Sequence, residues 1–262
     1  MEFFVDKQSI VRKIWSKADT ILFVFAGASA EFALNKAVDW LYFTGRLPAD
    51  PLGRLFSTVL YARQIVFSER EAAYKAIDKI TAIHTAVENS RGSRIPDWAY
   101  RDVLFLLIHY SQASFELLER KMTQDEKKEL FDVFNRVGLR MGLKELPADY
   151  KEWMIMHKEH LQNDLAKSDY TIDLFKQYRK HLGWMRYKLL IESQKLVVPQ
   201  YPKKLLNLGK ISWLIPVIFI YKFSRKIKMD WFLKSLVLPK AYKNQIEELD
   251  IAPSHFGRVS PK

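Results

Sequence analysis

The chain has 262 residues, of which 48% are hydrophobic and 14% aromatic. This length and composition exclude a disordered or fibrous protein and suffice for one large domain or two small ones with a sizeable core. Cysteine is absent, which excludes disulfides, zinc ribbons, iron–sulfur clusters and cysteine nucleophiles. Any bound iron must therefore lack cysteine thiolate ligands.

The net charge of +12 is unevenly distributed along the chain. Residues 199–262 hold 12 Lys and Arg residues against 4 Asp and Glu residues, whereas residues 1–198 hold 30 against 26. This basic tail contains an apolar run of 11 uncharged residues from Ile211 to Tyr221, and a membrane-spanning helix needs roughly 20. The pattern predicts either peripheral contact with an anionic membrane or a core helix followed by a solvated basic surface.

The sequence also bears on nucleic-acid binding and on cellular location. The sequence pI is near 9.6, but no recognition-helix, zinc-finger or RNP-like pattern is present, so we predict no nucleic-acid partner. The N-terminal stretch "MEFFVDKQSIVRKIW" mixes charges with apolar residues, which is not typical of a secretory signal. Two locations stay open: the cytoplasm, and a peripheral position on the inner face of the membrane.

Helix signals dominate the whole sequence, and no hairpin dipeptide separates alternating apolar runs. The predicted class is all-α. In chain order, the predicted helices are one or two within residues 19–43, then about 51–67, 69–89, 97–120, 124–141, 149–166 and 169–197.

Several helix ends carry capping signals. Asp50 precedes Pro51, which is an N-cap and first-turn pair. Ser68 with Glu71, and later Thr123 with Glu126, have the spacing of a capping box.

Two prolines, Pro199 and Pro202, mark the transition into the tail. We therefore divide the chain into a single multi-helix domain, residues 1–200, and a basic, partly apolar extension, residues 201–262. The extension is expected either to pack on the domain or to face a membrane.

The helix after Pro51 carries a polar stripe. Arg54, Ser57, Thr58 and Tyr61 fall at i, i+3, i+4 and i+7, which places one cation and three hydroxyls on one face. Neighbouring faces are apolar, so part of this stripe is expected to point into a cavity rather than into solvent.

Two histidines interrupt apolar faces of adjacent helices. His84 shares a stripe with Ile77, Ile80 and Val87, and His109 follows the apolar run "FLLI". A buried histidine is costly unless its nitrogens find partners. Spacing alone favours an ordinary core histidine, but two such residues on adjacent helices also suit a ligand site.

A third histidine pair lies in the stretch "MHKEH", where His157 and His160 are at i and i+3. This spacing fits neither a zincin nor a di-iron bundle. We predict that both side chains lie on a solvated face. Motifs of serine hydrolases, phosphate loops and dinucleotide-binding folds are absent from the sequence.

The order of these features resembles a known family. The stretch "DPLGRLFSTVLYARQIVFSEREAAYKAIDKITAIHTAVE" is followed by "IPDWAYRDVLFLLIHYSQ" and "LPADYKEW". This order resembles the oxygenase catalytic-domain family, which groups bacterial rubber oxygenase (latex-clearing protein) with the ER-bound oxygenase of mycophenolic acid biosynthesis. The resemblance covers roughly residues 22–200.

The resemblance implies an all-helical fold that encloses heme b, with oxygen chemistry on an apolar substrate. The first family histidine, matched by His84, would be the proximal iron ligand, and His109 matches a second family histidine that is the alternative heme ligand. Arg54 and Thr58 match residues of the distal side. Ser57 stands where rubber oxygenase has a lysine able to cap the iron, which implies an open or water-bound sixth position.

The opening of the domain departs from the family pattern. Ala28, Lys36 and Ala37 occupy the places of an arginine and of a His-Pro pair, so substrate contacts of that region are not carried over. Glu31 is a candidate pocket carboxylate, although an exposed helix position is the expected one.

The sequence therefore predicts a heme-dependent mono- or dioxygenase that acts on a hydrophobic small molecule or lipid-like substrate with dioxygen. Two alternatives stay open: a non-catalytic heme-binding protein, and a membrane-surface helical module with no cofactor.

Overall fold

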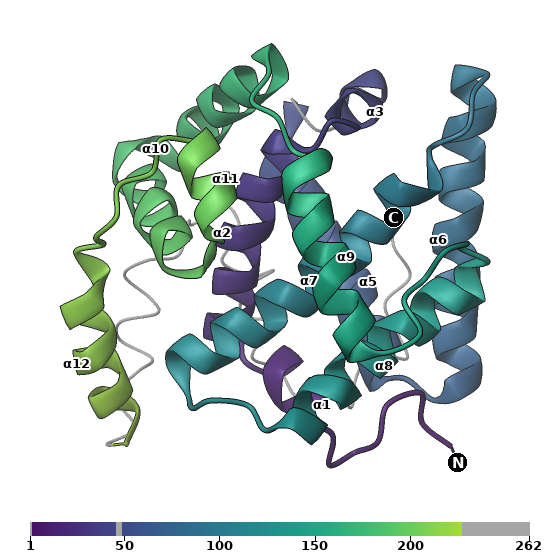
Figure 1. Cartoon of the computed structure of the whole chain (residues 1–262), viewed down its shortest axis with the longest axis horizontal. Helices are drawn as coiled ribbons and strands as arrows, with labels where there is room; N and C mark the ends of the chain where they lie inside the picture. Colours follow the sequence, from purple (N-terminus) through teal and green to yellow (C-terminus); the bar gives the residue numbers. More distant parts are fainter. Residues whose placement is uncertain (1, 46–48, 227–262) are drawn as a thin grey trace.

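The computed structural model describes residues 2–45 and 49–226 (Figure 1). For Leu55 and for residues 223–226 it describes the backbone but not the side chains. Within these residues the chain is helical and contains no β-strand, which confirms the all-α prediction. Most of the predicted tail, residues 227–262, lies outside the described residues. The helices are α1 (Ile10–Trp15), α2 (Ala18–Leu34), α3 (Val38–Phe43), α5 (Pro51–Phe67), α6 (Arg70–Arg91), α7 (Asp97–Leu118), α8 (Gln124–Met141), α9 (Tyr150–Asn163), α10 (Asp169–Val197), α11 (Gln200–Leu205) and α12 (Leu214–Lys226).

Two of the predicted helix starts are confirmed in atomic detail. At α5, the Asp50 side chain accepts a hydrogen bond from the Gly53 backbone N–H at 2.9 Å. At α8, Thr123 and Glu126 form both hydrogen bonds of a capping box. Each bond satisfies a backbone N–H that has no partner within the helix, so these starts are specified locally.

The predicted capping box at the start of α6 is wrong. Ser68 is the C-cap of α5, and the N-cap of α6 is Glu69, which makes no side-chain capping bond. Because α5 and α6 follow each other without a loop, Ser68 ends one helix instead of starting the next. The predicted end of this helix, at about residue 89, lies close to the observed last residue, Arg91. The C-cap is Gly92, whose φ of 69° lies in the left-handed region that glycine adopts freely.

Helix α2 forms the centre of the core, and it packs mainly against α7 and α10. Its sequence is apolar around nearly its whole circumference, which is typical of a helix covered on all sides. Figure 1 shows α2 near the middle of the molecule, with α6 at one edge and α12 at the opposite edge. The inner part of α2 therefore meets side chains from several other helices.

Close packing between α2 and α7 depends on Gly27. A Cβ atom at this position would lie 2.0 Å from Cδ1 of the buried Tyr110 ring. We expect Gly27→Ala to lower the free energy of unfolding by about 1–3 kcal/mol, because overpacking forces a shift of the ring or backbone. Urea unfolding measures the effect. Gly209→Ala is the control, since a Cβ there meets only Lys195 atoms at 3.7 Å; equal stability of the two variants would contradict the expectation.

The described part of the predicted extension lies against the preceding helices. Leu214 and Ile218 are each 8% exposed, and the Tyr221 hydroxyl donates a hydrogen bond to Asp19 Oδ2 at 2.7 Å. The opposite side of this segment leaves large apolar side chains in solvent, with Ile211 78% and Phe219 71% exposed. In the described part of the chain, no helix is both long enough and apolar enough to span a bilayer.

Candidate functional site

The polar stripe on α5 forms a small hydrogen-bonded group. Arg54 Nη1 donates to Ser57 Oγ at 3.2 Å and to Thr58 Oγ1 at 3.4 Å. Both hydroxyls in turn donate to the Arg54 carbonyl oxygen, at 2.8 and 3.2 Å. The two hydroxyl oxygens thus hold the guanidinium in one orientation. Tyr61, the fourth member of the predicted stripe, is half-buried one turn further along.

His84 lies on α6, which packs against α5. Its stripe turns inward as predicted, with Ile77 buried and His84 half-buried. The His84 ring meets Tyr100 of α7 edge-on, with ring centroids 5.0 Å apart. Its Nδ1 atom is buried and makes no hydrogen bond. This nitrogen is an unused polar atom inside the protein.

The surroundings of His84 keep its imidazole neutral. Burial and the positive charge of Arg54 lower the His84 pKa to about 4, against a smaller opposing effect of Glu88. Glu88 itself accepts a hydrogen bond from the Tyr100 hydroxyl at 3.0 Å. The structure therefore brings Arg54, Ser57, Thr58 and His84 into one electrostatic neighbourhood, and a neutral imidazole is the form that binds a metal ion.

His109 has different neighbours. Its ring stacks on His157 of α9, with centroids 4.8 Å apart and planes at 29°. His109 follows Tyr100, the contact of His84, by nine residues of α7, which is about 2.5 turns and places the two residues on opposite faces. Burial lowers the His109 pKa, although Glu31 and a hydrogen bond with the Val197 backbone act the other way. Its Nε2 atom is also buried without a hydrogen bond.

The prediction that His157 and His160 are solvated is wrong. They are 7% and 3% exposed, because the inner stripe of α9 runs through Tyr150, Trp153, His157 and His160 and faces the core. The spacing of 3, 4 and 3 residues from two aromatic residues to two histidines is the signal that indicated this buried face. His157 lies parallel to Trp153, with planes at 9°.

The expectation that Glu31 is exposed is also wrong, since its side chain is completely buried. The Tyr110 hydroxyl donates to Glu31 Oε2 at 2.7 Å, and His160 Nε2 lies 3.3 Å from Oε1. Burial alone would raise the Glu31 pKa, but the hydrogen bonds and the charges of His157 and His160 outweigh it and lower that pKa. Glu31 therefore stays ionised within the core.

His160 connects Glu31 to two further carboxylates. Its Nδ1 atom lies 2.8 Å from Asp102 Oδ1 and 3.2 Å from Asp164 Oδ2. Burial acts to lower the His160 pKa, but hydrogen bonds with Asp102 and Glu31 and their charges raise it to about 10. Sequence reasoning assigned no role to Asp102 or Asp164.

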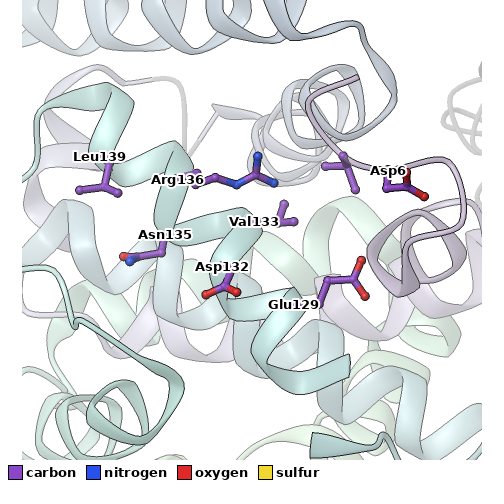
Figure 2. Close-up of a pocket in the computed structure, with 8 residues that line it drawn as sticks. Asp6, Glu129, Asp132, Val133, Asn135, Arg136 and Leu139 are labelled. Atoms are coloured by element: carbon purple, nitrogen blue, oxygen red, sulfur yellow. The ribbon is translucent and has the colours of Figure 1, made fainter. Parts of the chain in front are cut away.

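A separate surface pocket of about 530 Å³ lies between α8 and the N-terminal segment (Figure 2). Its rim carries three carboxylates, Asp6, Glu129 and Asp132, beside Arg136. The Arg136 guanidinium lies over the Phe4 ring at 4.5 Å. None of the predicted site residues lines this pocket.

Comparison with known proteins supports the family resemblance that the order of sequence motifs indicated. Residues 15–216 match the family described as "ER-bound oxygenase mpaB/B'/Rubber oxygenase, catalytic domain". No individual curated protein and no solved structure gives a significant match. Because the match covers well over half of the chain, this protein belongs to the family of mpaB-type and rubber oxygenase catalytic domains.

Proposed function

We propose that this protein is a heme-dependent oxygenase that uses dioxygen on a hydrophobic small-molecule or lipid-like substrate. The family supports oxygenase chemistry. The observation that carries the heme assignment is the buried His84 Nδ1 atom, which has no hydrogen-bond partner and belongs to an imidazole with a pKa lowered to about 4.

The donor set suits a heme iron. A neutral imidazole is a standard axial ligand of heme, and His84 meets this requirement over the whole physiological pH range. His109 is the alternative ligand, since its Nε2 atom is likewise buried without a partner. We assign His84 to the iron, because it shares its neighbourhood with the polar stripe of α5.

The side chains of α5 supply the polar side of the proposed site. Heme b, when bound, provides the binding and redox chemistry of dioxygen. Arg54 then supplies a fixed positive charge that stabilises negative charge developing on an oxygen atom, since Ser57 and Thr58 already orient its guanidinium. The hydroxyl of Thr58 adds a second polar contact. The oxygen atoms of Ser57 and Thr58 act mainly by positioning Arg54.

A visible absorption spectrum of the purified full chain tests this proposal. A Soret band with one heme b per chain, by pyridine hemochromogen assay, is expected. Protein that stays without heme after expression with heme precursors and after heme titration would refute the proposal. Heme binding without dioxygen consumption, in the presence of a reductant and apolar test substrates, would favour the non-catalytic heme protein instead.

We also propose peripheral contact with an anionic membrane, through the exposed side of residues 211–222. Ile211, Trp213, Phe219 and Ile220 are 78%, 52%, 71% and 65% exposed. Lys210 precedes this apolar surface, and Lys222 follows it with its ammonium group donating to the Leu117 carbonyl oxygen at 3.2 Å. Apolar side chains between basic residues suit the headgroup region of an anionic bilayer, where each base adds ~1 kcal/mol.

Liposome sedimentation with a double variant, Phe219→Ser with Ile220→Ser, tests the membrane contact. The pair removes roughly 3 kcal/mol of apolar transfer free energy, so partitioning into anionic vesicles should fall on the order of 100-fold. Leu139→Ser is the matched control, because Leu139 is 60% exposed on the distant α8. Equal sedimentation of wild type and double variant, or equal binding to neutral and anionic lipid, would contradict the proposal.

A further inference from the structure

Three helices meet at a buried group of metal-ligating side chains. Asp102 lies in the second turn of α7, His160 lies in the last turn of α9, and Asp164 is the C-cap of α9. One potential ligand atom from each residue lies within 4.8 Å of the others. The end of α2 completes the group with Glu31 and Asn35.

The distances within this group match neighbouring ligands of one metal ion. His160 Nδ1 lies 2.8 Å from Asp102 Oδ1 and 3.2 Å from Asp164 Oδ2. An octahedral ion with ligand bonds of about 2.1 Å places adjacent ligand atoms about 3 Å apart. Each aspartate oxygen therefore lies from the imidazole nitrogen at the separation of two adjacent ligands, and the two carboxylate oxygens lie within 4.8 Å of each other.

One carboxylate oxygen in this group has a single, poorly aligned partner. Asp102 is 1% exposed, and its Oδ1 atom lies 2.8 Å from His160 Nδ1 without the alignment of a regular hydrogen bond. A buried carboxylate oxygen with so little hydrogen bonding is costly. Coordination of a cation at this point would give Oδ1 a second partner.

Glu31 and Asn35 contact the candidate ligands and orient them. Glu31 Oε1 lies 3.3 Å from His160 Nε2, and Asn35 Nδ2 donates to the other Asp102 oxygen at 3.1 Å. A proton on Nε2 shared with Glu31 leaves Nδ1 as the atom facing the two aspartates. Metal-binding histidines commonly have such a carboxylate on their second nitrogen, because it fixes the tautomer. Tyr110 holds Glu31 in turn.

The local charge also favours a cation. Three carboxylates surround a single imidazole, and in the described part of the chain no lysine or arginine forms an ion pair with Glu31, Asp102 or Asp164. Helices α2 and α9 both end here, and the carbonyl end of a helix carries partial negative charge.

We propose that Asp102, His160 and Asp164 form a binding site for a divalent first-row metal ion of the Mn²⁺ or Fe²⁺ type, separate from the heme. One imidazole nitrogen and two carboxylates, with further positions for water, suit such ions. The Asp164 side chain is 27% exposed, which gives the ion a route from solvent. The bound ion would connect the end of α9 with the first turns of α7. The end of α2 would take part through the contacts of Glu31 and Asn35 with two of the ligands.

Titration of chelator-treated full-length protein with MnCl₂ tests the proposal, since the electron paramagnetic resonance signal of free Mn²⁺ falls on binding. One ion per chain is expected in wild type, with an imidazole nitrogen coupling in its electron spin echo spectrum. Asp164→Asn should weaken binding more than about 10-fold, and Glu31→Gln about 10- to 100-fold. Glu159→Gln, an exposed carboxylate on the same helix, should bind as wild type does.

Wild-type protein with no Mn²⁺ bound below millimolar concentration would overturn the proposal. A bound ion without nitrogen coupling, or one unaffected by Asp164→Asn, would do the same, because the ion would then lie elsewhere. The nitrogen coupling is measured on wild type and so does not depend on any variant folding. Soret absorbance of the same samples reports the heme separately, and Asp164→Asn should leave it unchanged.

Discussion

His84→Ala is expected to shift the Soret band of the purified protein and to lower its heme content. The variant removes the imidazole that we assign to the iron, so that water or no ligand takes its place. Added imidazole should partly restore the wild-type spectrum, because the free base fits the space that the side chain leaves. Absorption spectra with and without imidazole measure both effects.

His109→Ala is the matched control, since His109 is a second half-buried histidine with a nitrogen that lacks a partner. We expect it to leave the position of the Soret band in place. If His109→Ala shifts the band and His84→Ala does not, the axial ligand is misassigned. If neither variant changes the spectrum of a heme-containing preparation, neither histidine is the ligand.

The parts of the fold that local chemistry specifies could be predicted from sequence. The α5 start depends on Asp50 and Gly53, three residues apart, and the α8 start depends on Thr123 and Glu126. The failure at Ser68 has the same local origin, because one residue had the signals of both a helix end and a helix start. A capping pattern that spans only three or four residues does not show whether a residue between two adjacent helices ends the first helix or starts the second.

The same limit applies to the candidate site, where only residues on one helix could be grouped from the sequence. Arg54, Ser57 and Thr58 lie within two turns of one helix, so spacing alone grouped them. The cluster around His160 joins residues 31, 102, 160 and 164, which come from three helices and are up to 133 positions apart. Helical periodicity gives the face of each residue but not its partner on another helix, so this cluster was missed.

One signal for the buried cluster was nevertheless present in the sequence. Helix α2 has only two charged residues among 17, Asp19 near its start and Glu31 near its end. A carboxylate in a helix that is apolar all round must be buried, and a buried carboxylate requires partners. The same argument applies to His157 and His160, which continue the stripe of Tyr150 and Trp153.

Arg54→Ala is expected to keep the heme spectrum and to lower the rate of dioxygen consumption on the order of 10²-fold, since the loss of one preorganised donor typically costs that much. The physical reason is that the guanidinium, held by Ser57 and Thr58, is the fixed positive charge of the proposed site. An oxygen electrode measures the rate in the presence of a reductant.

The affinity of the ferric protein for cyanide gives a second readout that does not depend on turnover. Cyanide is a small anion, so Arg54→Ala should weaken its binding, whereas Ser57→Ala should have a smaller effect because Thr58 still holds the guanidinium. Arg54→Lys keeps the charge but loses the forked geometry, and we expect an intermediate affinity. Loss of heme from folded Arg54→Ala protein would contradict this role, because the arginine would then hold the heme itself and not act on the oxygen ligand.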